Sequence, residues 1–227
     1  IFNAIHGRDG NDHTAGSYPF QWPSKRSLKN LKVGYSKRRN TSDEDRQDLQ
    51  ILKSMGCELV ELRLPRSLPF SAMFSIIDVE ASTVFDSMIR EDDMDGFNLW
   101  KQNFRAAQYV SAVDYVRVQR ARSLLISQFD EAISEVDFII NMNDLVQTNF
   151  TGHPSVVMPI GYRERNSVRT PTPVILSGHL NDDERLLAFA DAFQAQVSAH
   201  QEHPKLDDWL NLYDSEQLDK PEDSGIN

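Results

Sequence analysis

Short apolar runs alternate with amphipathic segments along most of the chain, and this alternation predicts an α/β fold. Apolar runs of strand length lie at residues 31–35, 59–64, 137–140 and 173–176. Helical spacing of apolar residues predicts helices between them, including one at 70–89 and a longer one from Ser111 to about Val136. We therefore expect a mixed, mainly parallel sheet with helices on both faces.

The segment from residue 31 to residue 64 reads as strand, helix and strand. Ser42 is the predicted N-cap of this helix, because three acidic residues follow it and suit the positive end of the helix dipole. Gly56 suits the C-terminal end of the helix. Strand, helix and strand within about thirty residues predict parallel strands joined by a right-handed crossover.

The run from Ser155 to Ile160 is apolar at nearly every position and does not alternate. A strand with this pattern is covered on both faces, which is typical of the centre of an α/β sheet. We therefore predict that Val156–Ile160 is the central strand. The polar stretch from Tyr162 to Thr172 is expected to be a loop.

Three further local signals concern turns and caps. Ser111 and Asp114 have the spacing of a capping box at the start of the long helix. Asn181 or Asp182 should cap a last helix that runs to about His200. Gly152 should need a positive φ or a close backbone approach within the turn that precedes Ser155.

Composition and charge narrow the classes of function. The chain has 227 residues, 40% of them hydrophobic, which suffices for one large domain or part of a bigger one. A net charge of −10 argues against wholesale nucleic-acid binding. The one cysteine, Cys57, excludes an internal disulfide and a cysteine-rich zinc site, and we expect it to be a packed, inert thiol. No apolar run is long enough to cross a bilayer.

Candidate ligands for a metal or cofactor are few. His200 and His203 are three residues apart, but no third ligand lies near them in sequence, and a helix end explains them better. We predict neither a metal nor a cofactor. The sequence begins with Ile1 rather than methionine, so we expect a fragment or trimmed chain, with the cytoplasm as the default location.

Three blocks of the sequence share one resemblance. Residues 149–154 read Asn-Phe-Thr-Gly-His-Pro and lead into a strand that ends Pro-Ile-Gly at 159–161. Residues 100–122 form the second block, and residues 173–178 with 184–187 form the third. In order and spacing these blocks resemble the C-terminal half of the amidase signature family. The resemblance implies that residues 1–213 are the C-terminal portion of an amidase domain, and residues 214–227 are expected to be a disordered tail.

The resemblance also implies a reaction. The family cleaves amides with a serine nucleophile, a bridging serine and a lysine, which need a Gly/Ser-rich loop. No such loop occurs in this sequence, nor does a Gly-x-Ser-x-Gly elbow, a P-loop or a His-Glu-x-x-His motif. We therefore assign no catalytic residue. Asp9 and Asp12 match two acidic positions that follow the family's catalytic core, but we interpret both as ordinary turn residues.

The resemblance places substrate-binding residues before and within the block at 149–154. Asp144 resembles the acidic residue with which the amidotransferase A subunit holds its amino-acid substrate. A solvated or turn-capping aspartate is the open alternative for that position. Asn149, Thr151 and Gly152 complete the predicted substrate-binding set.

Three functions are open at this point. The first is the C-terminal fragment of an amide hydrolase, itself inactive, which needs a small-molecule amide and the missing N-terminal half as partners. The second is part of the A subunit of a glutamine-dependent tRNA amidotransferase. The third is a stand-alone binding module. Under the first two, the missing half should leave apolar surface exposed.

Overall fold

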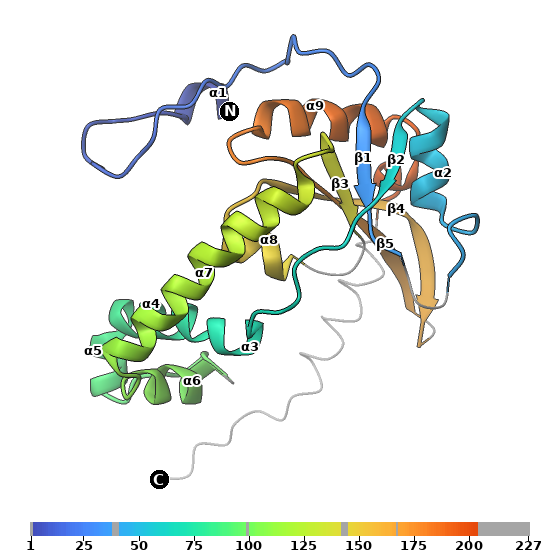
Figure 1. Cartoon of the computed structure of the whole chain (residues 1–227). Helices are drawn as coiled ribbons and strands as arrows, with labels where there is room; N and C mark the ends of the chain where they lie inside the picture. The colour runs from blue at the N-terminus through green and yellow to red at the C-terminus, as the bar shows by residue number, and fades with distance from the viewer. Residues whose placement is uncertain (1, 38–40, 99, 142–144, 167, 204–227) are drawn as a thin grey trace.

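The computed structural model describes residues 2–37, 41–98, 100–141, 145–166 and 168–203 (Figure 1). Its sheet has the strand order β2-β1-β3-β5-β4. The bounds are β1 (Lys32–Tyr35), β2 (Glu58–Glu61), β3 (Phe138–Asn141), β4 (Ser155–Arg165) and β5 (Val168–Ser177). β1 pairs parallel to β2 and β3, whereas β5 pairs antiparallel to β3 and β4. The predicted α/β class and mixed sheet are confirmed, with parallel pairing confined to one half of the sheet.

Helices cover both faces of the sheet, as predicted. On one face, α2 (Gln47–Ser54) and α9 (Asp183–Gln194) share a buried cluster with Phe138 and Ile140 of β3. On the other face, Ile139 packs with the C-terminal end of α7 (Ala112–Ile133). Successive side chains of a strand point to opposite faces, so β3 contributes to both clusters. The predicted parallel unit of β1, α2 and β2 is also confirmed.

The prediction that Val156–Ile160 forms the central strand is wrong, because β4 lies at the edge of the sheet. Met158 and Ile160 join the cluster under α9, but Val157 on the opposite face is 52% exposed. Pro159 lies opposite Pro173, and neither has an N–H group to donate to a ladder. An apolar run alone cannot distinguish such an edge strand from a central one.

The stretch from Tyr162 to Thr172 is a β-hairpin, not the predicted loop. β4 and β5 continue to pair as far as Arg165 opposite Val168. Glu164 lies directly opposite Arg169, and opposite charges in that position stabilise a pair of strands. This end of the hairpin is largely exposed, so its composition is polar and hides the strands from a hydrophobic pattern.

The predicted single helix at 70–89 is divided into three, namely α3 (Phe70–Met73), α4 (Ser75–Val84) and α5 (Asp86–Arg90). Phe85, between α4 and α5, has non-helical dihedral angles and packs against Phe97 and Phe104. These helices gather with α6 (Trp100–Ala107) around the N-terminal part of α7, away from the sheet (Figure 1). The remaining short elements are α1 (Phe2–Ile5), α8 (Val146–Thr151) and the 3₁₀ turn η1 (Ala199–Gln201).

The structure confirms the helix cap predicted at Ser111 and differs from the predicted helix limits elsewhere. The Ser111 hydroxyl accepts a hydrogen bond from the Asp114 N–H at 3.1 Å, so the predicted capping box begins α7. Ser42 makes the same contact with Asp45, but only within a turn, and α2 begins later, at Gln47. The last helix follows Asp182 as predicted but ends at Gln194, before His200.

Two further sequence predictions concern the ends of the chain and membranes. The tail predicted at 214–227 lies outside the described residues. Within the described ranges, every helix is too short or too polar to cross a lipid bilayer.

Gly152 has the positive φ expected of it, at 79°, and forms the C-cap of α8. A Cβ atom there would meet only Leu180 Cδ2, at 3.9 Å, so substitution by alanine strains the backbone without a clash. We expect Gly152→Ala to lower the free energy of unfolding by about 1 kcal/mol in a chemical denaturation experiment. Gly152→Asn should cost less, because asparagine tolerates the left-handed region.

Gly161 offers the matched control. It also has room for a methyl group, with Gln47 Oε1 at 3.8 Å, and its φ is not positive. If Gly152→Ala and Gly161→Ala shift the unfolding midpoint equally, the special role of Gly152 is refuted.

Candidate functional site

The carboxyl ends of β1, β2 and β3 meet at one edge of the sheet, because these strands are parallel. The connection from β1 to β2 passes through α2 on one face, and the connection from β2 to β3 passes through α7 on the other. Strands β2 and β3 flank β1, and the two connections run on opposite faces of the sheet, which makes the gap between β1 and β3 a topological switch point. Ligands of open α/β sheets bind at such points.

A hollow occupies this switch point. Its lining residues come from the ends of the three strands: Gly34, Tyr35, Ser36, Leu62, Leu64, Ile139 and Ile140. A Cβ atom on Gly34 would lie 2.1 Å from Leu62 Cδ1, so a larger residue there would have to displace the Leu62 side chain. The hollow is small, with a volume of about 10 Å³, which is room for about one water molecule.

The polar groups beside the hollow are already engaged with one another. The Tyr35 hydroxyl donates to Asp43 Oδ2 at 3.0 Å, and burial together with this carboxylate raises the pKa of Tyr35. Arg46 is 2% exposed, donates to the Ser36 carbonyl at 2.8 Å and pairs with Asp48 at 2.7 Å. These bonds fix the chain after β1 and stabilise the wall of the hollow.

The predicted substrate-binding residues follow β3 in the chain, and the structure separates their environments. Asp144 lies outside the described residues. Asn149 is exposed on α8, whereas Thr151 is only 3% exposed at the end of the same helix. Gly152 ends α8, which is a short helix where the sequence predicts a turn. Of the predicted set within the described ranges, Asn149 therefore presents its side chain to solvent.

The buried member of this segment belongs to a relay that sequence reasoning missed. The Thr151 hydroxyl lies 2.8 Å from His153 Nδ1, and His153 Nε2 lies 2.9 Å from Asp130 Oδ1. The His153 ring also packs 4.6 Å from the ring of Phe129. One consistent tautomer has Thr151 donating to Nδ1 and Nε2–H donating to Asp130.

Hydroxyl, imidazole and carboxylate in this order have the connectivity of a nucleophilic triad. The His153 side chain is wholly buried, so no substrate carbonyl can reach the Thr151 hydroxyl beside it. The relay therefore clamps α8 and the start of β4 to α7. Arg122 adds to this clamp, because its Nε donates to the Phe150 carbonyl at 2.7 Å. Asp130 and His153 lie 23 residues apart in sequence, so no local pattern signals their contact.

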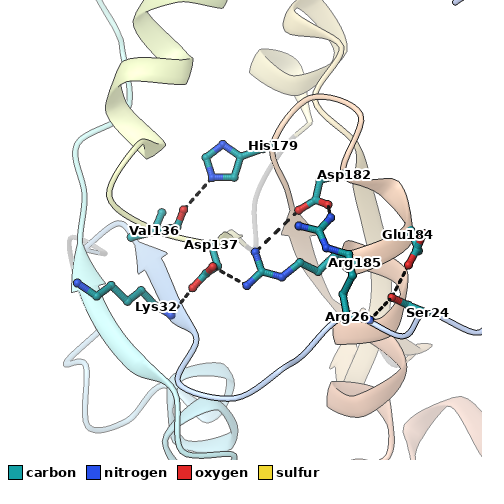
Figure 2. A network of polar contacts seen from close by, with 9 residues as sticks. All are labelled: Ser24, Arg26, Lys32, Val136, Asp137, His179, Asp182, Glu184 and Arg185. Carbon is teal, nitrogen blue, oxygen red and sulfur yellow. Dashed lines mark hydrogen bonds and ion pairs between the residues drawn. The ribbon is translucent and has the colours of Figure 1, made fainter. Parts of the chain in front are cut away.

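A second polar network lies at the opposite, amino end of the strands (Figure 2). Asp137 accepts hydrogen bonds from the Lys32 N–H at 2.8 Å and from Arg185 at 2.6 Å. Burial would raise the pKa of Asp137, but these two hydrogen bonds and the Arg185 charge outweigh it and lower the pKa. Glu184 accepts from Ser24 at 2.6 Å, which fastens the N-terminal segment to α9. The network joins β1, β3 and α9 and has a structural role.

The remaining candidates behave as ordinary structure. Asp9 and Asp12 are exposed and accept hydrogen bonds from nearby turn residues. Burial raises the pKa of the Cys57 thiol, in line with a packed, inert cysteine. Within the part of the chain that the structure describes, no three His, Cys, Asp or Glu side chains come together to hold a metal ion.

Comparison with known proteins gives the fold a family. No family model matches the chain. An amidase from Pseudomonas putida is 26% identical over an alignment of 192 positions, which spans 68% of this chain and 39% of that protein. The A subunit of a glutamyl-tRNA(Gln) amidotransferase from Chloroflexus aggregans is 22% identical over an alignment of 264 positions, which spans 91% of this chain and 53% of that protein.

Solved structures agree with these matches. A 6-aminohexanoate cyclic dimer hydrolase superposes with a TM-score of 0.66 at 16% identity, over 88% of this chain and 52% of the hydrolase. A bacterial aryl acylamidase of the amidase signature family superposes with a TM-score of 0.58 at 14% identity, over 76% of this chain and 44% of the acylamidase. The chain is a distant homologue of the amidase signature family.

This amidase signature homologue spans about half the length of the curated relatives it matches. The block at 149–154 that carries the resemblance forms the end of α8, the His153 relay and the entry to β4. Much of that block therefore serves the packing of the amidase fold, and Asn149 is its exposed polar residue.

The His153 relay makes the stability of the fold depend on pH. Burial lowers the pKa of His153, and the hydrogen bond and charge of Asp130 oppose this only in part. The unfolded chain, with a histidine pKa of about 6.5, thus binds the proton more readily than the folded chain does. The free energy of unfolding should be highest above about pH 6.5 and fall as the pH drops below it, by at most about 1.4 kcal/mol per pH unit.

The test compares the free energy of unfolding at about pH 7.5 and about pH 5.5. His153→Gln should reduce the difference between the two values, whereas His13→Gln, at an exposed histidine, should leave it unchanged. An acid sensitivity that is equal in all three proteins would contradict the assignment to His153.

Proposed function

We propose that this chain is the half of an amide hydrolase that lines the substrate pocket and does not supply the nucleophile. The distant homology to amidases and the shared fold support this proposal. The sequence contains no Gly/Ser-rich loop of the kind that holds the family's catalytic serines and oxyanion hole. The nucleophile would then come from the half of the enzyme that this chain does not match.

The observation that carries the proposal is that the family resemblance and the topology of the sheet point to the same segment for substrate binding. The family resemblance marks the segment around Asp144 and Asn149 for the substrate. In the fold, that segment links β3 to α8, and β3 ends beside the hollow at the topological switch point. An α/β sheet binds its ligand at that place.

Each predicted residue then has a role that fits its chemistry. The Asp144 carboxylate accepts hydrogen bonds from an amino or amide group of the substrate, and Asn149 adds a neutral hydrogen bond. Thr151 and Gly152 act through the backbone, since the Thr151 hydroxyl contacts His153 and Gly152 ends α8.

A second candidate is a part of the A subunit of a glutamine-dependent amidotransferase. The match to the amidotransferase protein of Chloroflexus aggregans covers 91% of this chain, whereas the match to the Pseudomonas putida amidase covers 68%. Under this alternative the substrate is glutamine, and the ammonia passes to a partner protein. Assaying glutamine beside a simple aryl amide in the complete enzyme separates the two.

The proposal predicts that the purified chain by itself does not hydrolyse an aryl amide such as an N-acetylated nitroaniline. The measurement is release of the coloured amine over a blank without protein. Ser155, whose hydroxyl lies 2.8 Å from that of Ser177 across the hairpin, is the serine to test if turnover appears. Turnover that disappears in Ser155→Ala would show that the chain carries its own nucleophile and would refute the division of labour.

In the chain assembled with its nucleophile-bearing half, Asp144→Asn should raise KM about tenfold and leave kcat nearly unchanged. This follows if Asp144 binds the ground state and the transition state equally through a charge-assisted hydrogen bond. Glu164→Gln, an exposed carboxylate on the hairpin, is the matched control and should leave both constants unchanged. Unaltered kinetics in Asp144→Asn, with or without lower thermal stability, would remove Asp144 from the pocket.

A further inference from the structure

The short helix α8 is held differently at its two ends. At the carboxyl end, Arg122 Nε donates to the Phe150 carbonyl at 2.7 Å, and the His153 relay fixes the chain that follows. At the amino end, the N-cap residue Leu145 makes no side-chain hydrogen bond to the helix. A helix of six residues is unstable by itself, so its uncapped first turn needs contacts with other parts of the chain.

Gln147 makes such a contact from the first turn of α8. Its Nε2 donates to the Pro65 carbonyl at 2.6 Å, in the connection between β2 and α3. A carbonyl oxygen can only accept, so the carboxamide must present Nε2 to it. The other polar atom, Oε1, is buried and has no hydrogen-bond partner in the part of the chain that the structure describes. The polar role of Gln147 therefore rests on one bond, which joins residues 82 positions apart in sequence.

This bond connects α8 to the chain beside the hollow. Leu64, which precedes Pro65, lines the hollow at the switch point. Gln147 lies within the turn that closes when the Asn149 N–H donates to the Leu145 carbonyl at 2.8 Å. Residues 147 and 149 are about 200° apart around an α-helix, so Gln147 faces Pro65 while Asn149 is exposed to solvent. The contact on the inner side of α8 thus determines where its outer side points.

We propose that Gln147 is the positioning residue of the substrate-binding segment. It ties the first turn of α8 to the chain beside the hollow, and so sets the position of Asn149 relative to the switch point. This inference rests on the proposed function, which assigns substrate binding to that segment. Gln147 acts through α8 rather than by touching the substrate, because its Nε2 is engaged with Pro65 and its Oε1 is buried.

Gln47 offers a matched control for this contact. Its Nε2 donates to the Ile160 carbonyl at 3.2 Å, and this hydrogen bond is partly buried, like that of Gln147. It joins α2 to β4, and neither element carries a predicted substrate-binding residue. Methionine is similar to glutamine in length and has no N–H group to donate, so each glutamine is replaced by methionine.

The first test measures amide hydrogen exchange of the 227-residue chain by NMR. In Gln147→Met, the α8 N–H groups, such as that of Asn149, should exchange about three- to tenfold faster, as expected for the loss of one hydrogen bond. In Gln47→Met these groups should exchange at the wild-type rate. The inference is overturned if Gln147→Met leaves α8 unchanged or if both variants change α8 equally. Faster exchange spread evenly over all helices also overturns it, because this indicates a global loss of stability.

The second test measures the steady-state hydrolysis of an aryl amide by the complete enzyme. Gln147→Met should raise KM by about three- to tenfold and leave kcat nearly unchanged, because a displaced segment binds the ground state and the transition state equally less well. Gln47→Met should leave KM unchanged. Adding Gln147→Met to Asn149→Ala should raise KM no further, since a positioning residue acts only through the residue that it positions. Effects on KM that multiply would show that Gln147 acts independently of Asn149 and would overturn the inference.

The two tests separate this inference from the proposed function. If the complete enzyme hydrolyses no amide, the proposed function fails, and the exchange rates alone decide whether Gln147 holds α8 in place. If the enzyme hydrolyses the amide with the same KM in the wild type and in Gln147→Met, the proposed function stands and the positioning role is refuted.

Discussion

The fold depends on the burial of β3 on both faces. Phe138 and Ile140 enter the cluster under α2 and α9, and the Phe138 ring stacks on that of Phe189 with centroids 4.6 Å apart. Ile139 enters the opposite cluster with the end of α7. A strand of four residues is buried on both faces only where helices cover both, and here α2 and α9 cover one face of β3 and α7 covers the other.

This constraint also creates the candidate site. Because α2 and α7 lie on opposite faces, the chain diverges at the carboxyl ends of β1 and β3 and leaves the hollow between them. The absence of a side chain on Gly34 leaves room for the Leu62 side chain at the wall of the hollow. The buried ion pair of Arg46 and Asp48 fixes the chain that follows β1. The packing of the central strand and the position of the site thus have the same cause.

The polar interactions divide between the two ends of the strands. At the amino ends, Asp137 and Arg185 join β1, β3 and α9 in the network of Figure 2. Near the start of β4, the His153 relay joins α7 and α8 to the sheet. Both networks join residues of different elements of this chain and stabilise the scaffold. The amidase chemistry that we propose therefore depends on the exposed residues around Asn149 and on the half of the amidase fold that this chain does not match.

The sequence by itself determined the features that depend on neighbouring residues. Ser111 caps α7 because its hydroxyl reaches the N–H three residues later, and Gly152 ends α8 because glycine accepts a positive φ. The parallel unit of β1, α2 and β2 followed in the same way, since its short connection permits few alternatives. The family resemblance also came from local blocks of sequence.

Only the tertiary structure decided which strand is central and which polar groups meet. The apolar run of β4 is compatible with a central strand or an edge strand. In the structure β4 pairs with β5 and with no other strand of the described sheet, so it lies at the edge. Phe85 interrupts the helical stretch at 70–89 because it packs against the aromatic rings of Phe97 and Phe104, which come later in the chain. His153 finds Asp130 across 23 residues for the same reason. Such contacts depend on distances in space between residues far apart in the chain, and the periodicity of side chains records only distances along it.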